Sequence, residues 1–304
     1  MIRALLAAVL LALAASHAAA QVDAEIALER DALLLYEPIR LLVQLTNLSP
    51  RPLDLAKPTG EKLWLEVYVT RADDSAVPRT AKPWAPPTAL LMPGQKRVLE
   101  TNLLSVFQVR EPGDYRIHVR VNYGDRSAAS RLLKLAVERG TPLWQQQAVL
   151  PPDSSESSGG ARTRLYTLLV HRADATRELF ARIQDPDQDR VFCTTRLGPW
   201  VNSSDLDAKV DRDGVLHVLQ RAGARIFRYS RLTAVGKLAP QRLFSNLGSV
   251  PRLAVLGNEA VEVVGGEEIV PGDKPQKLEG IIPTAPVGAP RGQERAPVSR
   301  RDGF

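Results

Sequence analysis

The stretch GDYRIHVRV, residues 113–121, decides the fold class of this chain. Its apolar side chains occupy alternate positions, namely Tyr115, Ile117, Val119 and Val121. Because successive side chains of a β-strand point to opposite faces, this period of two predicts a strand with one buried face. The pattern recurs at residues 39–45, 63–69 and 133–137, separated by prolines and glycines. Such repetition is typical of an antiparallel β-sandwich.

A tyrosine heads this strand, directly after the turn EPGD at residues 111–114. A hydroxyl placed there can fold back onto the preceding loop, as in the tyrosine corner of immunoglobulin-like sandwiches. Residues 24–138 resemble the immunoglobulin-like sandwiches of bacterial secreted proteins, and within that class the bacterial intracellular-proteinase-inhibitor type. The motifs that carry this resemblance are VQLTN (43–47), PLDL (52–55), LLMPGQ (90–95) and PGDYRI (112–117). The resemblance implies a fold, and a fold does not transfer function.

The second half of the chain contains an internal repeat. The segment KVDRDGVLHVL at 209–219 aligns with AVLGNEAVEVV at 254–264, 45 positions later. Residues 179–195 resemble 226–246 in the same way, as strand, polar turn and strand. A period of about 40–45 residues is typical of a propeller blade, and the segment DRDGVLHV (211–218) resembles part of one. Because only about two units fit, we expect a blade-like two-sheet domain; assembly of several chains is the alternative.

Two segments break the strand pattern. Residues 140–162 include PPDSSESSGG, and the chain after residue 270 is rich in proline, glycine and charge. The first segment predicts a flexible linker and the second a disordered tail. The expected organisation is a signal peptide at 1–20, an immunoglobulin-like sandwich at 21–139, a linker at 140–162, a blade-like repeat domain at 163–270 and a tail at 271–304.

The first twenty residues, MIRALLAAVLLALAASHAAA, predict export. Arg3 supplies the positive start, residues 4–15 are apolar, and small side chains end at Ala20. We therefore expect signal peptidase to cleave between Ala20 and Gln21. The apolar run is shorter than the roughly 20 residues that span a bilayer, and no second candidate follows. The expected product is a soluble bacterial protein of the periplasm or the exterior, with no transmembrane anchor.

The charge distribution argues against a nucleic-acid partner. The formal net charge is +6, but basic and acidic residues are interspersed through both expected domains. Nucleic-acid binders concentrate positive charge on one face. The expected partner is therefore a protein or another component of the cell envelope.

The sequence contains none of the common catalytic or metal motifs, such as HExxH, GxSxG or a Cys/His cluster. The single cysteine, Cys193, lies in a strand-like run and is expected to be a small buried residue. A nucleophile or an intermolecular disulfide is the alternative. We expect His171 at a strand end on the surface, and His217 as a satisfied, partly buried residue rather than a catalytic base. His118 is expected on a solvated strand face, with an anion-contacting stripe as its alternative.

Two aspartate-rich segments are interpreted as turns. They are DPDQD at 185–189 and DRDG at 211–214. Calcium takes oxygen ligands, but an EF-hand loop that began at Asp185 would need Gly and Glu where Arg190 and Arg196 stand. We expect no metal and no cofactor.

One strand combines arginines with aromatic rings. Alternate positions place Arg225, Tyr229 and Arg231 on one face, together with Phe227. Exposed arginine and tyrosine side chains favour a recognition surface. The alternative is a half-buried strand covered by arginine stems.

The sequence thus predicts an exported, non-enzymatic binding or scaffold protein. A secreted hydrolase with a site in the second domain is one alternative. A protease inhibitor that presents a rigid loop around residues 83–87 is the other.

Overall fold

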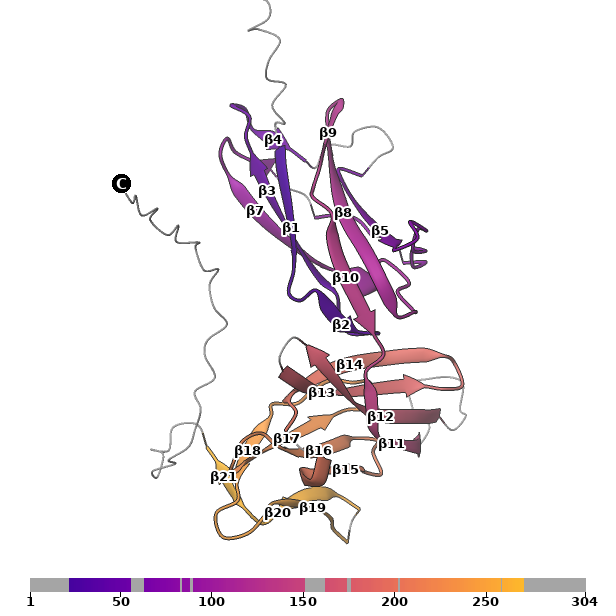
Figure 1. The fold of residues 1–304 in the computed structure, drawn as a ribbon, viewed down its shortest axis with the longest axis vertical. Coiled ribbons are helices and arrows are strands. Elements are labelled where there is room, and N and C mark those ends of the chain that lie inside the picture. Colours follow the sequence, from indigo (N-terminus) through magenta and orange to yellow (C-terminus); the bar gives the residue numbers. More distant parts are fainter. Residues whose placement is uncertain are drawn as a thin grey trace, which may run out of the picture.

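The computed structural model describes residues 22–55, 63–82, 84–87, 90–150, 162–173, 176–201, 203–257 and 259–270. Within these ranges the regular elements are β-strands and two single-turn 3-10 helices, η1 (Leu103–Ser105) and η2 (Ser203–Asp205). Figure 1 shows a sandwich stacked end to end on a second all-β domain. The all-β fold class is therefore confirmed. The predicted signal peptide, residues 151–161 of the linker and the tail at 271–304 lie outside the described residues.

The first domain is a sandwich of two sheets. One sheet has the order β1 (Val22–Leu28), β3 (Arg40–Asn47) and β7 (Lys96–Asn102). The other has the order β2 (Ala32–Leu34), β10 (Leu133–Glu138), β8 (Gly113–Tyr123) and β5 (Leu65–Arg71), with β9 (Arg126–Ala129) paired to β8. Two short strands, β4 (Leu53–Asp54) and β6 (Leu90–Leu91), pair with each other. Neighbouring strands run antiparallel except for β2 and β10.

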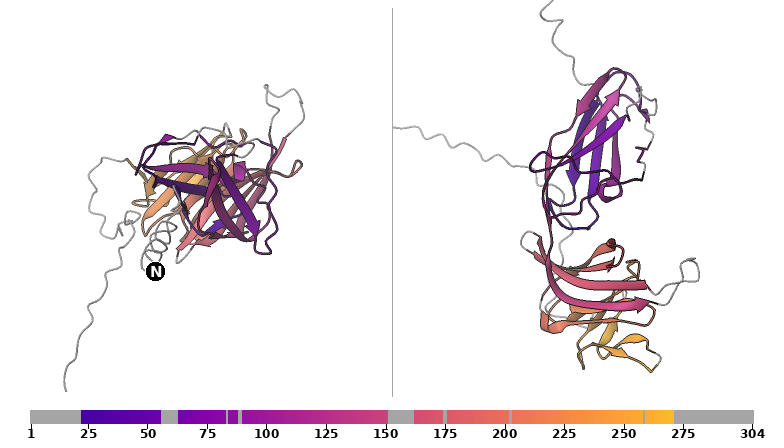
Figure 2. Two further views of the ribbon diagram at one scale, coloured as in Figure 1. Left: turned by 90° about the horizontal axis from the view of Figure 1, so that it is seen from above. Right: turned by 90° about the vertical axis from the view of Figure 1, so that its right-hand side faces the viewer.

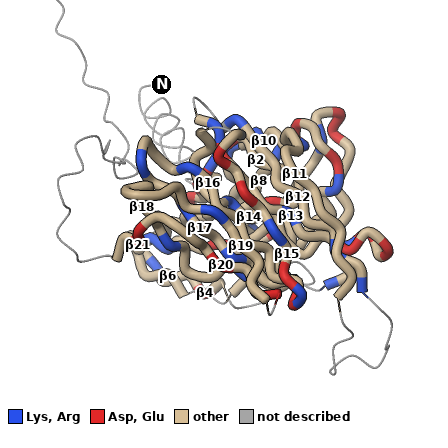
Figure 3. Tube along the Cα trace, turned by 90° about the horizontal axis from the view of Figure 1, so that it is seen from below, with Lys and Arg blue, Asp and Glu red and all other residues tan. Residues whose placement is uncertain are grey.

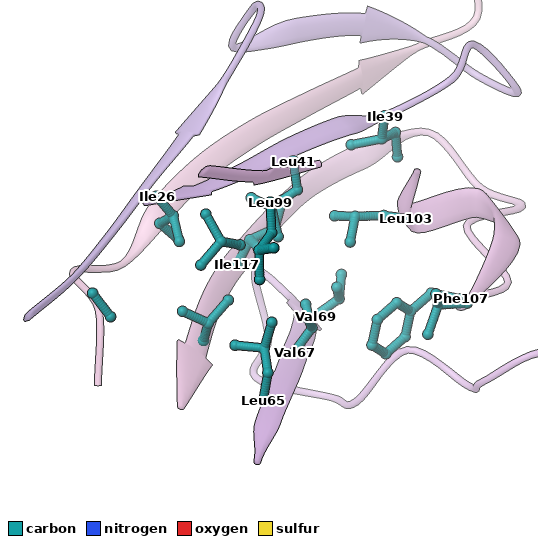
Figure 4. Close-up of a cluster of buried hydrophobic side chains, with 14 of the residues drawn as sticks. Ile26, Ile39, Leu41, Leu65, Val67, Val69, Leu99, Leu103, Phe107 and Ile117 are labelled. Atoms are coloured by element: carbon teal, nitrogen blue, oxygen red, sulfur yellow. The ribbon is translucent and has the colours of Figure 1, made fainter. Parts of the chain in front are cut away.

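The alternate apolar residues of the sequence pattern fill the sandwich core. Ile117 of β8 is fully buried, in one cluster with Leu41 of β3 and Leu99 of β7 from the facing sheet (Figure 4). Burial of a side chain of this size contributes roughly 1.5–3 kcal/mol. The tyrosine corner is also present, because the Tyr115 hydroxyl donates to the carbonyl of Glu111 at 2.6 Å.

The second domain consists of two antiparallel meanders and a hairpin. The first sheet is β11 (Thr141–Leu150), β12 (Arg162–Ala173), β13 (Thr176–Asp185) and β14 (Arg190–Pro199), in that order. The second is β15 (Leu206–Val210), β16 (Leu216–Arg221), β17 (Ile226–Leu232), β18 (Arg242–Ser245) and β21 (Glu267–Ile269). The hairpin joins β19 (Arg252–Val255) to β20 (Val261–Val264).

Apolar side chains fill both interfaces of the second sheet. Leu168 and Ile183 of the first sheet pack with Leu216 and Val218 of the second. On the other face of the second sheet, residues of the β19–β20 hairpin pack against an aromatic cluster that includes Phe227. The space between the two meanders is therefore hydrophobic core.

The internal repeats of the sequence correspond to hairpins in the structure. Residues 209–219 span the β15–β16 turn and 254–264 span the β19–β20 turn. Residues 179–195 and 226–246 contain the β13–β14 and β17–β18 hairpins. The units that form layers are the two meanders, however, and the first of them begins before the predicted repeat.

The linker predicted from residue 140 is wrong for residues 141–150. These residues form β11, and Figure 2 shows the chain passing from the sandwich directly into this sheet. Glutamines at 145–147 interrupt the apolar alternation, and Leu150, at the end of the strand, is its one buried residue. β11 is an edge strand whose pairing depends on β12.

Candidate binding site at the domain junction

The first sheet of the second domain is covered on both faces. On β13, Leu179 and Ala181 point into the core between the meanders, while Phe180 points the opposite way. Phe180 packs with Leu169 of β12 against Leu34 of the sandwich. The junction between the domains therefore has its own small apolar centre.

A glycine makes the close approach at this junction feasible. Gly140 lies between β10 and β11 with a φ of +73°. A Cβ atom at this position would lie 2.7 Å from Leu34 Cδ2 and 3.2 Å from the Val170 carbonyl oxygen. Glycine adopts positive φ without strain and leaves that space free.

Four charged side chains alternate in sign across the junction. They are Glu37, Arg30, Glu178 and Arg196. Arg30 pairs with Glu37 and, at 3.4 Å between Nη1 and Oε2, with Glu178, which also pairs with Arg196. Burial raises the pKa of Glu37, although the Leu34 N–H and the Arg30 guanidinium oppose the shift. Because an unpaired buried charge is costly, this network favours one placement of the two domains.

A backbone carbonyl of the sandwich adds two further bonds. The oxygen of Leu35 accepts from Arg182 Nη2 at 2.6 Å and from Thr194 Oγ1 at 3.4 Å. The Arg182 guanidinium lies 5.4 Å from the centre of the Tyr36 ring, and burial lowers its pKa. The loop after β2 is thus held against β13 and β14.

Two cavities flank this contact. The larger, of about 450 Å³, lies between the η1 region of the sandwich and β14. The smaller, of about 290 Å³, lies beside the charge network. Both are lined by Pro38, Thr194 and Thr195, so together they border a continuous stretch of β14. Cavities of a few hundred Å³ at domain interfaces are common ligand sites.

Strand β14 is the edge of its sheet. It pairs with β13 on one side and has no strand partner among the described residues on the other. The register with β13 shifts at Phe192 and again at Leu197. The Leu197 carbonyl accepts from Gln241 Nε2 at 3.0 Å and from Arg228 Nη1 at 3.2 Å. Side chains of the second sheet therefore close one end of this edge.

The predicted recognition surface lies elsewhere and is only partly exposed. Arg225 and Arg231 are exposed, but Tyr229 is 4 % exposed and packs with Phe227 and Phe244 in the core under the hairpin. The expectation that Tyr229 forms a recognition surface is wrong. The face that alternation assigned to solvent is covered by β19 and β20, which the local pattern could not reveal.

The prediction for His217 is confirmed, and the prediction for His171 is wrong. His217 is buried and satisfied: Nδ1 lies 2.6 Å from the Tyr229 hydroxyl and Nε2 lies 3.0 Å from Asp211 Oδ2. Burial lowers its pKa, although Asp211 opposes the shift. His171 is not at a surface strand end but is 2 % exposed within β12, with Nε2 3.0 Å from Glu138 across the junction. The sandwich covers it.

His118 is half-buried on β8, and its ring stacks on Tyr68 with 4.8 Å between the centroids. Burial lowers its pKa, and Arg120 adds to that effect. Cys193 is a half-buried residue of β14, as the strand-like run indicated. Burial raises the pKa of its thiol, which keeps the sulfur protonated near neutral pH and a weak nucleophile.

Both aspartate segments form turns, as predicted. Asp185 accepts from the backbone N–H groups of Asp187 and Gln188 and pairs with Arg164 at 2.9 Å. Asp211 accepts from the N–H groups of Asp213 and Val215. Their carboxylates thus serve the turn rather than a ligand. In the described part of the chain, no three His, Cys, Asp or Glu residues group as they would around a metal ion.

Sequence reasoning missed the junction site. Its residues come from the loop after β2, the η1 region and β14, which are far apart in the chain. The run RVFCTTR at 190–196 indicates a strand, but only the sheet order shows that this strand is an edge.

Comparisons with known proteins assign no family. No protein-family model matches the chain, and no curated protein is similar to it. One similar solved structure is the Pseudomonas fluorescens alkylpurine DNA glycosylase AlkC bound to DNA containing an abasic site analog, at 20% identity and a TM-score of 0.25. The alignment covers 42% of this chain and 33% of that chain. This similarity is too partial to assign a fold or an activity. In the ranges that the structure describes, no helix is both long and apolar enough to cross a membrane.

Proposed function

We propose that this chain is an exported, non-enzymatic binding or scaffold protein of the bacterial envelope or exterior. The observation that carries the proposal is the pair of adjacent cavities along β14, together called the junction cleft, which are lined by residues of both domains beside the ion pair that joins them. A preformed cleft between two docked domains binds a partner without a large ordering cost.

The proposed partner is a protein or another envelope component rather than a nucleic acid. Figure 3 shows Lys and Arg positions interspersed with Asp and Glu over the end of the second domain. Such a mixture lacks the concentrated positive face that phosphate backbones require.

The two alternatives have less support. A hydrolase site between the meanders would need space that Leu168, Ile183 and Leu216 fill. The inhibitor loop is expected around residues 83–87, of which the structure describes 84–87. Within that segment Trp84 packs against the sandwich core instead of projecting as a free loop.

Site-specific cross-linking tests the proposal. Benzoylphenylalanine in place of Arg190, which directly precedes the cavity-lining Val191 and is exposed, should cross-link a partner in the native cell. The same probe in place of Ser127, an exposed residue of β9, should not. A second substitution, Ser105→Trp, narrows the cleft and should remove the cross-link. Equal cross-linking from both positions, or none from position 190, would contradict a binding role for the junction.

A further inference from the structure

We propose that the junction cleft binds an extended peptide segment of a partner protein. The segment adds as a further antiparallel or parallel strand to the free edge of β14 and presents a carboxylate to Arg110. This inference rests on the proposed function and names the chemistry of the partner.

The two cavities lie along consecutive residues of β14. The larger cavity touches every residue from 191 to 195, and the smaller one touches 194 to 196. The register with β13 shifts at Phe192, but from Cys193 to Arg196 consecutive side chains point to opposite faces, so a cavity that covered only one face would touch every second of these residues. The cleft therefore runs alongside the backbone of β14.

The backbone of β14 is free of strand partners on the side away from β13, among the described residues. The outer edge of a strand directs N–H and C=O groups of alternate residues away from the sheet. Among the described residues, no backbone hydrogen bond from another segment reaches residues 191–196 on this side. At Leu197, by contrast, Gln220, Arg228 and Gln241 donate to the carbonyl. The edge is thus closed by side chains at one end and open where it faces the cleft.

The walls of the larger cavity combine one cation with apolar and aromatic side chains. Arg110 is the single charged residue that lines the larger cavity, it is exposed, and it pairs with no described acidic residue. Tyr36, Leu104, Phe107 and Phe192 line the same cavity. These walls fit a segment that carries a bulky apolar side chain beside an aspartate, a glutamate or a terminal carboxylate.

The smaller cavity adds little net charge to this recognition. Its arginines are already engaged, since Arg30 and Arg196 pair with Glu178, and Arg40 lies 3.8 Å from Glu100.

The length of the open edge sets the length of the bound segment. Because paired strands have the same rise of about 3.3 Å per residue, the open stretch of β14 accommodates a segment of about six residues.

Peptide selection on the whole protein tests this inference. Random heptapeptides displayed on phage would be selected on the mature chain, and binding of the enriched peptides measured by fluorescence anisotropy. We expect enrichment of alternating apolar residues with an acidic residue. Arg110→Glu should weaken binding of such a peptide tenfold or more. Arg131→Glu, a matched charge reversal at an exposed site outside the cleft, should leave it unchanged.

Backbone methylation separates strand addition from other modes of binding. N-methylation of alternate peptide residues in one register should abolish binding, because it removes the N–H groups that would pair with β14. The inference would be overturned if the methylated peptides bound as tightly as the unmethylated ones, or if Arg110→Glu left the affinity for the peptide unchanged. A failure to enrich any peptide while position 190 still cross-links a partner would also overturn it; that result would leave the proposed function standing. If Arg110→Glu perturbs the circular dichroism spectrum, Ser105→Trp replaces it with the same expected loss.

Discussion

Arg30, in the loop after β1, and Glu178, on β13, form an ion pair across the domain junction although they are 148 positions apart in the chain. Each also pairs with a second partner from its own domain, Glu37 for the arginine and Arg196 for the glutamate. The pair between Arg30 and Glu178 joins these two local pairs, and it forms only when the domains are docked. This relationship makes the cleft along β14 a property of the whole chain rather than of either domain.

Glu178→Gln should destabilise the docked protein by about 1–2 kcal/mol, because it removes the buried carboxylate that Arg30 reaches across the junction, while Arg30 keeps its pair with Glu37. Urea denaturation would measure the change. Glu100→Gln is the matched control, since its pair with Arg40 is exposed and such pairs contribute about 0–1 kcal/mol. Equal effects of the two substitutions would show that the junction network does not hold the domains together.

Tyr115→Phe should cost about 1–1.5 kcal/mol, because it removes the hydroxyl that satisfies the carbonyl of Glu111. Tyr68→Phe removes a hydroxyl that bonds the side chain of Glu66 on a more accessible strand face, and should cost less. Thermal unfolding of the two variants provides the comparison. A smaller effect at Tyr115 than at Tyr68 would exclude a structural role for the tyrosine corner.

The stability of the protein should fall in acid through His217. Burial lowers the pKa of this histidine below its ordinary value of 6.5, so the unfolded chain takes up its proton more readily than the folded protein. The contribution is therefore fully present above pH 6.5 and is lost as the pH falls through the lower folded pKa. His217→Gln should flatten the dependence of the urea midpoint on pH between about pH 7 and pH 5. Identical slopes for the variant and the parent protein would refute this.

Chelation should leave the melting temperature unchanged. The Asp185 carboxylate is occupied by Arg164 and by two backbone N–H groups, so it has no need of a cation. A metal that bound only the folded state would raise the melting temperature by mass action. Calorimetry with and without EDTA, and then with excess calcium, checks the expectation. A drop on chelation that calcium reverses would restore the calcium interpretation of residues 185–189.

Export should produce a chain that begins at Gln21. The charged, apolar and small-residue parts of the first twenty positions specify cleavage after Ala20. Intact mass spectrometry of the exported protein should match residues 21–304. Recovery of an exported form that retains Met1 would contradict the prediction.

Local patterns in the sequence were sufficient for the strands, the tyrosine corner and the hairpins. The alternation around Ile117 identifies the face of β8 that is buried. The aspartates at 185 and 211 accept hydrogen bonds from backbone N–H groups only a few residues away. Each of these features depends on neighbours along the chain, so a single sequence contains the information. The same reasoning failed for β11, because its glutamines interrupt the alternation and its pairing with β12 supplies the order.

Only the tertiary structure decided whether the second face of each strand is covered by another layer or exposed to solvent. Alternation assigns two faces to a strand but does not say which is met by another layer, and so Tyr229 and His171 are buried where solvent was expected. The edge position of β14 follows from the order of the strands in its sheet. The pairing of Arg30 with Glu178 and the smaller cavity beside it bring together segments more than a hundred residues apart. Amino-acid sequence determined the strands of this protein; the packing of distant strands against one another determined its candidate site.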